Sequence, residues 1–182
     1  MSTFVQANDF SRTTSAVVVM DFQNNILKNV PDAATILRNA AVILESVRAN
    51  GFRLIYVQHR GGAYAIDEPG SAFADAVKPL SGEKILPKTK PGPFSTTALD
   101  VTLREMGVET LVLLGVTTSG CVLTATRWAV DLNYKFVVIA DACGDREPEV
   151  HDFLVQRLFP KWGTVATAAQ FQNMIAVTTD AA

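Results

Sequence analysis

Short runs of apolar, largely β-branched residues alternate along the chain with longer stretches in which apolar residues recur at helical spacing. The first pattern predicts buried strands and the second predicts amphipathic helices. The predicted strands cover residues 16–20, 52–58, 85–86, 110–114, 136–140 and 164–167. The predicted helices cover residues 33–50, 96–106, 122–132 and 147–159, with a short helix near residues 73–77. Strands alternating with helices predict an α/β fold, in which helices cover both faces of a parallel sheet.

Polar or reactive side chains follow several of the predicted strands. Asp21, His59 and Asp141 stand directly at strand ends. Lys88 lies just beyond the third strand, and Cys121 follows the fourth after a short turn. In parallel sheets the chemistry sits beyond the carboxyl ends of the strands. We therefore expect these five side chains along one edge of the sheet.

Cys121 is the strongest candidate nucleophile because it opens a predicted helix. The unpaired N–H groups at a helix start favour the thiolate, which is the reactive form of cysteine. Most intracellular cysteines, however, are small buried hydrophobes, so position alone leaves both interpretations open. Asp21 is the candidate base for the thiol proton, and Lys88 is the candidate cation that stabilises the thiolate.

Composition and charge narrow the classes of function. The 182 residues are 48% hydrophobic and carry a formal net charge of −2, which fits one soluble domain (residues 1–182) with a polar N-terminal extension at residues 1–14. No basic block favours a nucleic acid or a membrane surface as partner, and no stretch is long enough to span a bilayer. The two cysteines cannot build a disulfide framework, so we expect a cytoplasmic location.

Motifs for other common chemistries are missing. The glycines at 115 and 120 have the spacing of a phosphate loop, but the lysine that such a loop needs is replaced by Cys121. No dinucleotide fingerprint follows the first strand, and no serine-hydrolase elbow is present. His59 and His151 are far apart and lack the spacing of zinc ligands. We therefore expect neither a metal nor another cofactor.

Three motifs resemble those of the isochorismatase-like cysteine hydrolase superfamily, over about residues 17–167. Residues 19–24 resemble its first-strand motif, with Asp21 as the catalytic aspartate. Lys88 with the residues up to 99 resembles its lysine motif. Residues 115–126 around Cys121 resemble its nucleophile motif, which is the most specific of the three. The strand end at residues 139–143 and His151 also fit.

This resemblance implies a Rossmann-like three-layer sandwich around six parallel strands. It further implies an Asp21–Lys88–Cys121 triad and a cis peptide bond between Val116 and Thr117. The N–H groups of Thr117 and Cys121 would then form an oxyanion hole. Homodimers or homotetramers are also implied. The substrate pocket that we expect comprises Gln23, Ile26, His59, Tyr64, Phe94 and Thr118.

The sequence departs from parts of the superfamily in ways that bear on the substrate. Members that deamidate nicotinamide carry a metal site that residues 58–62 of this chain cannot supply. Members that hydrolyse the vinyl ether of isochorismate often lack the cysteine, whereas this chain has Cys121. Both differences favour a metal-free hydrolase of small amide, carbamoyl or ureido compounds, similar to N-carbamoylsarcosine amidohydrolases. Vinyl-ether hydrolysis stays open as an alternative.

Two further classes of function also stay open. Altered pocket positions at Asn25 and Ile26 are compatible with a catalytically silent binding or scaffold domain. Cys143, at the end of the neighbouring predicted strand, could act as a resolving thiol in a redox-sensing protein.

The long irregular segment at residues 59–83 is the expected selector of substrate, because long loops in compact domains are usually functional. Tyr64 and Phe73 suggest an apolar lid there. Several large apolar residues also occur late in the chain, and one core of this size is not expected to bury all of them. They are Trp128, Phe159, Trp162, Phe171 and Met174. This surplus supports the expected self-association.

Overall fold

The computed structural model describes residues 4–5, 9–65 and 68–179, and in these residues six strands form a single sheet. The strands are β1 (Ser15–Met20), β2 (Arg53–His59), β3 (Lys84–Lys88), β4 (Thr110–Val116), β5 (Lys135–Gly144) and β6 (Thr164–Ala166). Their order is β3-β2-β1-β4-β5-β6, and every neighbouring pair is parallel. The predicted six-stranded parallel sheet is thus confirmed.

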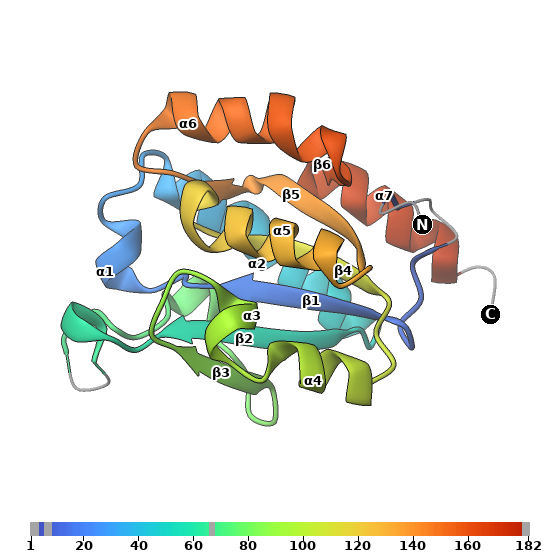
Figure 1. Cartoon of the computed structure of the whole chain (residues 1–182), viewed down its shortest axis with the longest axis horizontal. Coiled ribbons are helices and arrows are strands. Elements are labelled where there is room, and N and C mark those ends of the chain that lie inside the picture. Colours follow the sequence, from blue (N-terminus) through green and yellow to red (C-terminus); the bar gives the residue numbers. More distant parts are fainter. Residues whose placement is uncertain (1–3, 6–8, 66–67, 180–182) are drawn as a thin grey trace.

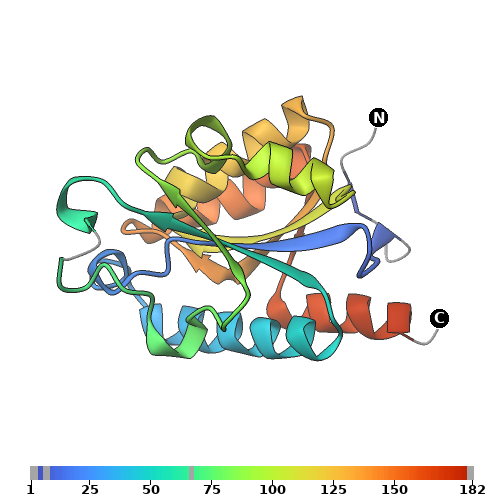
Figure 2. The ribbon, with the colours of Figure 1, turned by 90° about the horizontal axis from the view of Figure 1, so that it is seen from below.

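Helices cover both faces of the sheet and make a three-layer sandwich (Figures 1 and 2). The long helix α2 (Ala33–Ala49) and the C-terminal helix α7 (Ala168–Thr179) lie on one face. The helices α4 (Leu99–Glu105), α5 (Leu123–Asp131) and α6 (Pro148–Phe153) lie on the other. Two single-turn helices, α1 (Asn24–Leu27) and α3 (Pro93–Thr96), follow β1 and β3. None of the helices in the described ranges has the length and apolar character needed to cross a membrane.

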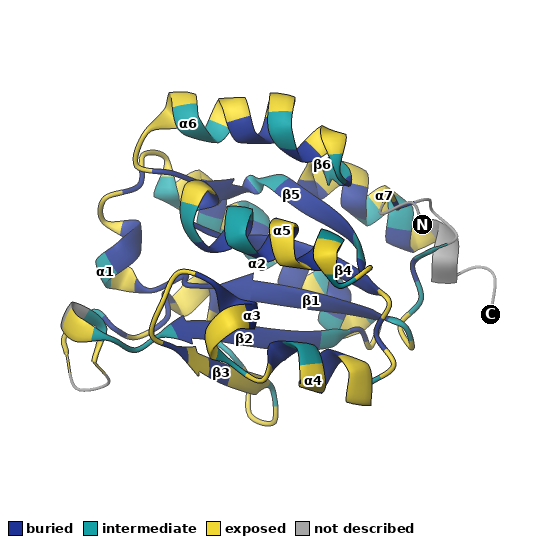
Figure 3. Ribbon diagram, viewed as in Figure 1, coloured by how far each residue is buried: buried dark blue, intermediate teal, exposed yellow. Residues whose placement is uncertain are grey.

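The core is centred on β1, whose six residues are all buried (Figure 3). A strand that is covered by helices on both faces reads as a continuous apolar run, which explains the sequence at residues 16–20. The neighbouring strand β4 is buried along its whole length for the same reason.

The strand order reverses between β1 and β4, so the connections leaving these two strands run to opposite sides of the sheet. A crevice opens beyond the carboxyl ends of the strands at such a switch point. Asp21 directly follows β1, and Thr117 directly follows β4. The two strands approach closely here, since a Cβ atom on Gly115 would lie only 2.7 Å from the backbone oxygen of Met20. Glycine at this position therefore keeps Asp21 and the turn after β4 close together.

The fifth strand is longer than predicted. It continues past Asp141 to Gly144, after a register irregularity opposite residues 113–115. The prediction that Asp141 ends the strand is therefore wrong. The Asp141 carboxylate instead accepts a hydrogen bond of 2.7 Å from the N–H of Ala168, at the start of α7. In the sequence, Asp141 looked like the end of a strand because it is a polar residue at an irregularity within β5.

The two ends of the chain also differ from the simplest expectation. Helix α7 was not predicted, because its apolar residues are interspersed with glutamine, asparagine and threonine. Residues 1–3 and 6–8 of the expected N-terminal extension lie outside the described residues. Phe10 belongs to that extension yet is buried, with its ring edge-on to Phe171 at 5.5 Å between centroids. This part of the extension therefore packs onto α7.

Candidate active site

Asp21 and Lys88 form a buried ion pair at the carboxyl end of the sheet. The Lys88 Nζ atom lies 2.7 Å from Oδ2 of Asp21, and the side chains are 1% and 6% exposed. Lys88 Nζ also donates to the backbone oxygens of Lys90 at 3.1 Å and Pro91 at 3.0 Å. An ammonium has three N–H donors, so these three partners account for all of them. Lys88 is therefore occupied in holding Asp21 and the loop after β3.

The second oxygen of Asp21 is in a different situation. Oδ1 is buried and makes no hydrogen bond of normal geometry to any described residue. The Cys121 thiol nevertheless lies near enough to affect the pKa of the carboxyl group. Asp21 also has a backbone φ of 60°, a left-handed conformation that is uncommon outside glycine, asparagine and aspartate. The turn after β1 thus presents an unpartnered carboxylate oxygen beside the thiol.

Cys121 lies in a π-helical turn (Thr118–Val122) that links β4 to α5. The backbone oxygen of Thr117 accepts hydrogen bonds from the N–H groups of Gly120 (3.2 Å) and Val122 (3.4 Å) and from the Cys121 thiol (3.6 Å). The Val116–Thr117 peptide bond is cis. The N–H of Thr117 donates to no other group in the described ranges.

The pKa shifts show which group holds the proton before reaction. Burial raises the pKa of Asp21 to about 6, against the opposing effects of Lys88 and the Cys121 thiol. Burial also raises the pKa of Cys121 well above its usual value, and the negative charge of Asp21 adds to this increase. The expectation that a helix start favours the thiolate is therefore wrong for the resting protein. A protonated thiol stands beside a carboxylate that is mostly ionised at neutral pH.

These groups line one cavity of about 160 Å³, called the Cys121 cavity below. Its other walls include Ile26, His59 and Tyr64, three of the six residues expected in the substrate pocket. A cavity of this size fits a small molecule, since pockets for drug-sized ligands are usually about 300 Å³ or more.

The other three residues expected in the pocket lie elsewhere. Gln23 is fully buried, and its amide hydrogen bonds to backbone groups of His59 and Ser71. Phe94 is buried and stacks on Trp128 at 6.3 Å between ring centroids. Thr118 is buried, and its Oγ1 lies 2.8 Å from Nδ1 of His151. None of the three lines the Cys121 cavity.

Arg146 also lines this cavity, and sequence reasoning missed it. It is exposed, and its guanidinium makes no ion pair or hydrogen bond to another described side chain. Because the Lys88 donors are all occupied, Arg146 is the cavity cation left to meet an anion. The sequence would have indicated Arg146 as a site residue only if the predicted strand at residues 136–140 had been extended to Gly144.

His59 lies at the wall of the Cys121 cavity. Its ring packs edge-on against Tyr64, with 4.9 Å between centroids. Burial lowers the pKa of His59, and the positive charge of Lys88 lowers it further, so the ring is mostly neutral at pH 7. Within the described residues, no group of three or more histidine, cysteine, aspartate or glutamate side chains is arranged to hold a metal ion.

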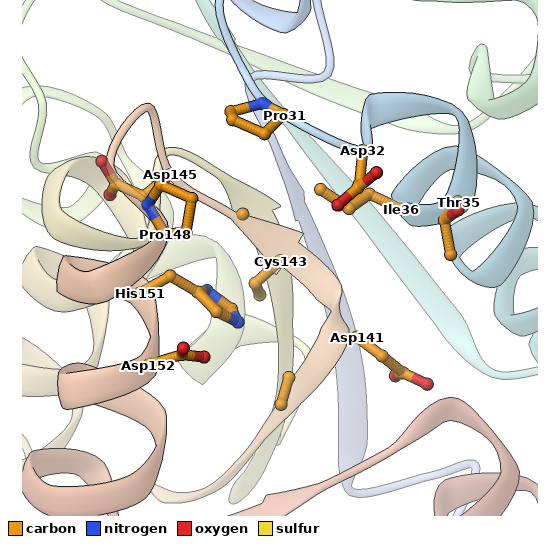
Figure 4. A pocket seen from close by; sticks show the side chains of 12 residues that line it. Pro31, Asp32, Thr35, Ile36, Asp141, Cys143, Asp145, Pro148, His151 and Asp152 are labelled. Carbon is orange, nitrogen blue, oxygen red and sulfur yellow. The ribbon is translucent and has the colours of Figure 1, made fainter.

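Cys143 lines a different space. It borders a cavity of about 260 Å³ between α2 and α6, called the rear cavity below, together with Asp145 and His151 (Figure 4). Burial raises the pKa of Cys143 to about 12, which disfavours its reactive thiolate form.

Comparison with known proteins fits this geometry. Residues 15–170 match the isochorismatase domain. The chain belongs to the isochorismatase family. It is 32% identical over 151 residues to the isochorismatase family protein YddQ of Bacillus subtilis, covering 78% of this chain and 84% of that protein. It is 26% identical over 204 residues to ureidoacrylate amidohydrolase RutB of Agrobacterium fabrum, covering 88% and 90%.

Solved structures of the family have the same fold. An isochorismatase family protein from Burkholderia thailandensis superposes with a TM-score of 0.82 at 28% identity, covering 92% of this chain and 97% of the other. N-carbamoylsarcosine amidase from Thermoplasma acidophilum superposes with a TM-score of 0.75 at 26% identity, covering 85% and 96%. The chain is an isochorismatase-family hydrolase.

Proposed function

We propose that this hydrolase cleaves the C–N bond of a small amide, carbamoyl or ureido compound that carries a carboxylate, through a thioester on Cys121. The observation that carries the proposal is the Lys88–Asp21 pair of 2.7 Å, which leaves the second oxygen of Asp21 unpartnered beside the thiol. That oxygen is suited to take the thiol proton and to return it later.

The first half of the reaction forms the thioester. Asp21 removes the proton of Cys121 as the sulfur attacks the carbonyl carbon, and the carbonyl electrons move to oxygen. The N–H groups of Thr117 and Cys121 donate to this oxyanion. The C–N bond then breaks, and the leaving nitrogen takes the proton from Asp21. Lys88 keeps the Asp21 carboxylate in place and lowers its pKa against the effect of burial.

The second half returns the protein to its starting state. Asp21 takes a proton from water, and the resulting hydroxide attacks the thioester carbon. The C–S bond breaks, the acid product leaves, and Asp21 gives the proton back to the Cys121 sulfur. No added metal or redox partner is needed to balance these steps.

Arg146 supports the choice of a carboxylate-bearing substrate. A guanidinium binds a carboxylate with two parallel hydrogen bonds, and this one lacks a protein partner in the described residues. The name of the RutB relative, ureidoacrylate amidohydrolase, denotes a ureido compound with a carboxylate. The solved amidase is named for N-carbamoylsarcosine, a carbamoyl compound with a carboxylate.

A substrate panel tests the proposal. Ammonia release is measured with amides and ureido acids of increasing length, each beside its uncharged methyl ester, and pyruvate release is measured with isochorismate for the vinyl-ether alternative. We expect turnover of at least one carboxylate-bearing amide or ureido acid, a large preference over its ester, and loss of turnover in Cys121→Ala. Full turnover by Cys121→Ala would disprove the thioester route, and turnover of isochorismate alone would favour the alternative.

A further inference from the structure

The turn that carries the Cys121 thiol is hydrogen-bonded to the side chain of a residue that directly follows β5. Asp145 comes directly after Gly144, and it is 8% exposed. Its Oδ2 accepts a hydrogen bond of 2.6 Å from the N–H of Ser119, two residues before Cys121. Its Oδ1 accepts a hydrogen bond of 2.8 Å from the N–H of Arg146. One carboxylate therefore binds the nucleophile turn and the backbone of the cavity arginine.

A second bond joins the same two segments. Oγ1 of Thr118, the neighbour of Ser119, lies 2.8 Å from Nδ1 of His151 on α6. Figure 4 shows Asp145 and His151 on the same side of the rear cavity, with Pro148 between them in sequence. Two consecutive residues of the nucleophile turn are thus bonded to the segment of residues 145–151 that also supplies Arg146.

We infer that Asp145 is a positioning residue that fixes the distance between the Cys121 thiol and the Arg146 guanidinium, and thereby sets the preference for a substrate that carries a carboxylate. The inference rests on the proposed function for the identity of that substrate as a carboxylate-bearing amide. Hydrogen bonds from backbone N–H groups to a carboxylate are stronger than those between neutral groups, so this link is stiff. Neither oxygen of Asp145 lines the Cys121 cavity, so its effect passes through the backbone of the two segments.

Alkylation of Cys121 tests this without any turnover. Iodoacetate and iodoacetamide react with a thiolate by the same displacement of iodide, but only iodoacetate carries a carboxylate. The quantity measured is the rate with iodoacetate divided by the rate with iodoacetamide, and this ratio is then divided by the same ratio for a free cysteine peptide. Mass spectrometry confirms that the label is on Cys121 rather than on Cys143. The wild-type protein is expected to prefer iodoacetate because Arg146 attracts the anion.

The variants separate positioning from general damage. Arg146→Gln is expected to remove the preference for iodoacetate over iodoacetamide. Asp145→Ala is expected to lower the preference for iodoacetate by about fivefold. The double variant with Arg146→Gln should lose no more of the preference than Arg146→Gln alone, because residues that act through one another are not additive. Asp145→Ala is also expected to lower the iodoacetamide rate, because the hydrogen bond to the Ser119 N–H is lost. Asp152→Ala, which alters another carboxylate of the rear cavity, is the matched control.

Two results overturn the inference: no preference for iodoacetate in the wild type, or an unchanged preference in Asp145→Ala. If Asp145→Ala does not fold, Asp145→Asn gives the same decision, because its amide oxygen can accept only one of the two N–H groups well and its NH₂ group opposes the other. The proposed function fails separately. A preference that depends on Asp145, in a protein that hydrolyses no amide or ureido acid, would leave this inference standing and disprove the proposed reaction.

Discussion

Gln23 hydrogen bonds to both backbone groups of His59. Its Oε1 accepts from the His59 N–H at 2.8 Å, and its Nε2 donates to the His59 oxygen at 3.1 Å and to the Ser71 oxygen at 2.8 Å. Gln23 is fully buried and lies outside the Cys121 cavity. It therefore acts on the cavity through His59 rather than by contact with a ligand.

Replacing Gln23 by alanine is expected to destabilise the fold by about 3 kcal/mol, because buried backbone groups lose their partners and a small cavity is left. Urea unfolding measures the change. Gln156→Ala, on the exposed side of the turn that continues α6, is the matched control and should stay within about 0.5 kcal/mol of the wild type. A normal midpoint for Gln23→Ala, together with a raised KM, would instead mean that Gln23 contacts substrate.

Much of this arrangement was predictable because the apolar runs mark buried strands and the polar residues after them mark the sheet edge. Asp21, Lys88 and Cys121 are brought together as expected. The side chains that the sequence misplaced depend on tertiary contacts. Gln23 and Thr118 look like pocket residues by proximity to Asp21 and Cys121, yet their side chains turn inward to backbone and histidine partners.

Arg146 and Asp145 could not be assigned from the sequence for a different reason. Their place at the catalytic edge depends on β5 running through an irregularity to Gly144, which the apolar pattern does not reveal. The state of Cys121 was also misjudged, because a helix start favours the thiolate while burial and the Asp21 charge oppose it more strongly. Burial of that kind is a property of the assembled sheet edge.

The raised pKa of Asp21 predicts an acid limb in the pH dependence of kcat/KM. Only the carboxylate can accept the thiol proton, so activity should rise with pH and level off above about 6. Lys88→Met removes the charge that lowers this pKa, so the limb should move to higher pH. Turnover measured across the acid range tests both points. An acid limb that stays in place in Lys88→Met would show that Asp21 does not produce it.

Asp21 should also make the free energy of unfolding fall as the pH rises. Its folded-state pKa of about 6 is raised above the ordinary value of 3.8, so the folded chain binds this proton more tightly than the unfolded chain does. The resulting contribution to the free energy of unfolding is fully present below pH 3.8 and is lost as the pH rises through about 6. Asp21→Asn should remove this part of the pH dependence. An identical dependence in wild type and variant would contradict the assignment.

Within residues 59–83, Tyr64 and Phe73 have different expected effects. Tyr64 lines the Cys121 cavity, whereas Phe73 is buried edge-on to Tyr56 at 5.4 Å between ring centroids. Tyr64→Ala should change the ranking of amides by kcat/KM while Cys121 still reacts with iodoacetamide. Phe73→Ala should instead lower the free energy of unfolding by about 3 kcal/mol. An unchanged ranking in Tyr64→Ala would remove this segment from substrate selection.

Self-association is expected through Trp128 rather than through the other late aromatic residues. Phe159 and Phe171 are fully buried, and Trp162 packs beneath Arg127 at 4.5 Å. Trp128 remains 39% exposed on α5. Light scattering should give a mass of a dimer or tetramer for the wild type and a lower mass for Trp128→Lys. A wild-type mass near 19.7 kDa would mean a monomer and would contradict the expectation.

The covalent intermediate on Cys121 is the most direct test of the proposed chemistry. The protein is mixed with a carboxylate-bearing amide that it turns over, quenched in acid within the first turnovers, and analysed by mass spectrometry. The account predicts an added mass equal to the acyl part of the substrate, located on Cys121 and absent from Cys121→Ala, which should release no ammonia. Wild-type turnover in Cys121→Ala, or rapid turnover with the label on another residue, would contradict it.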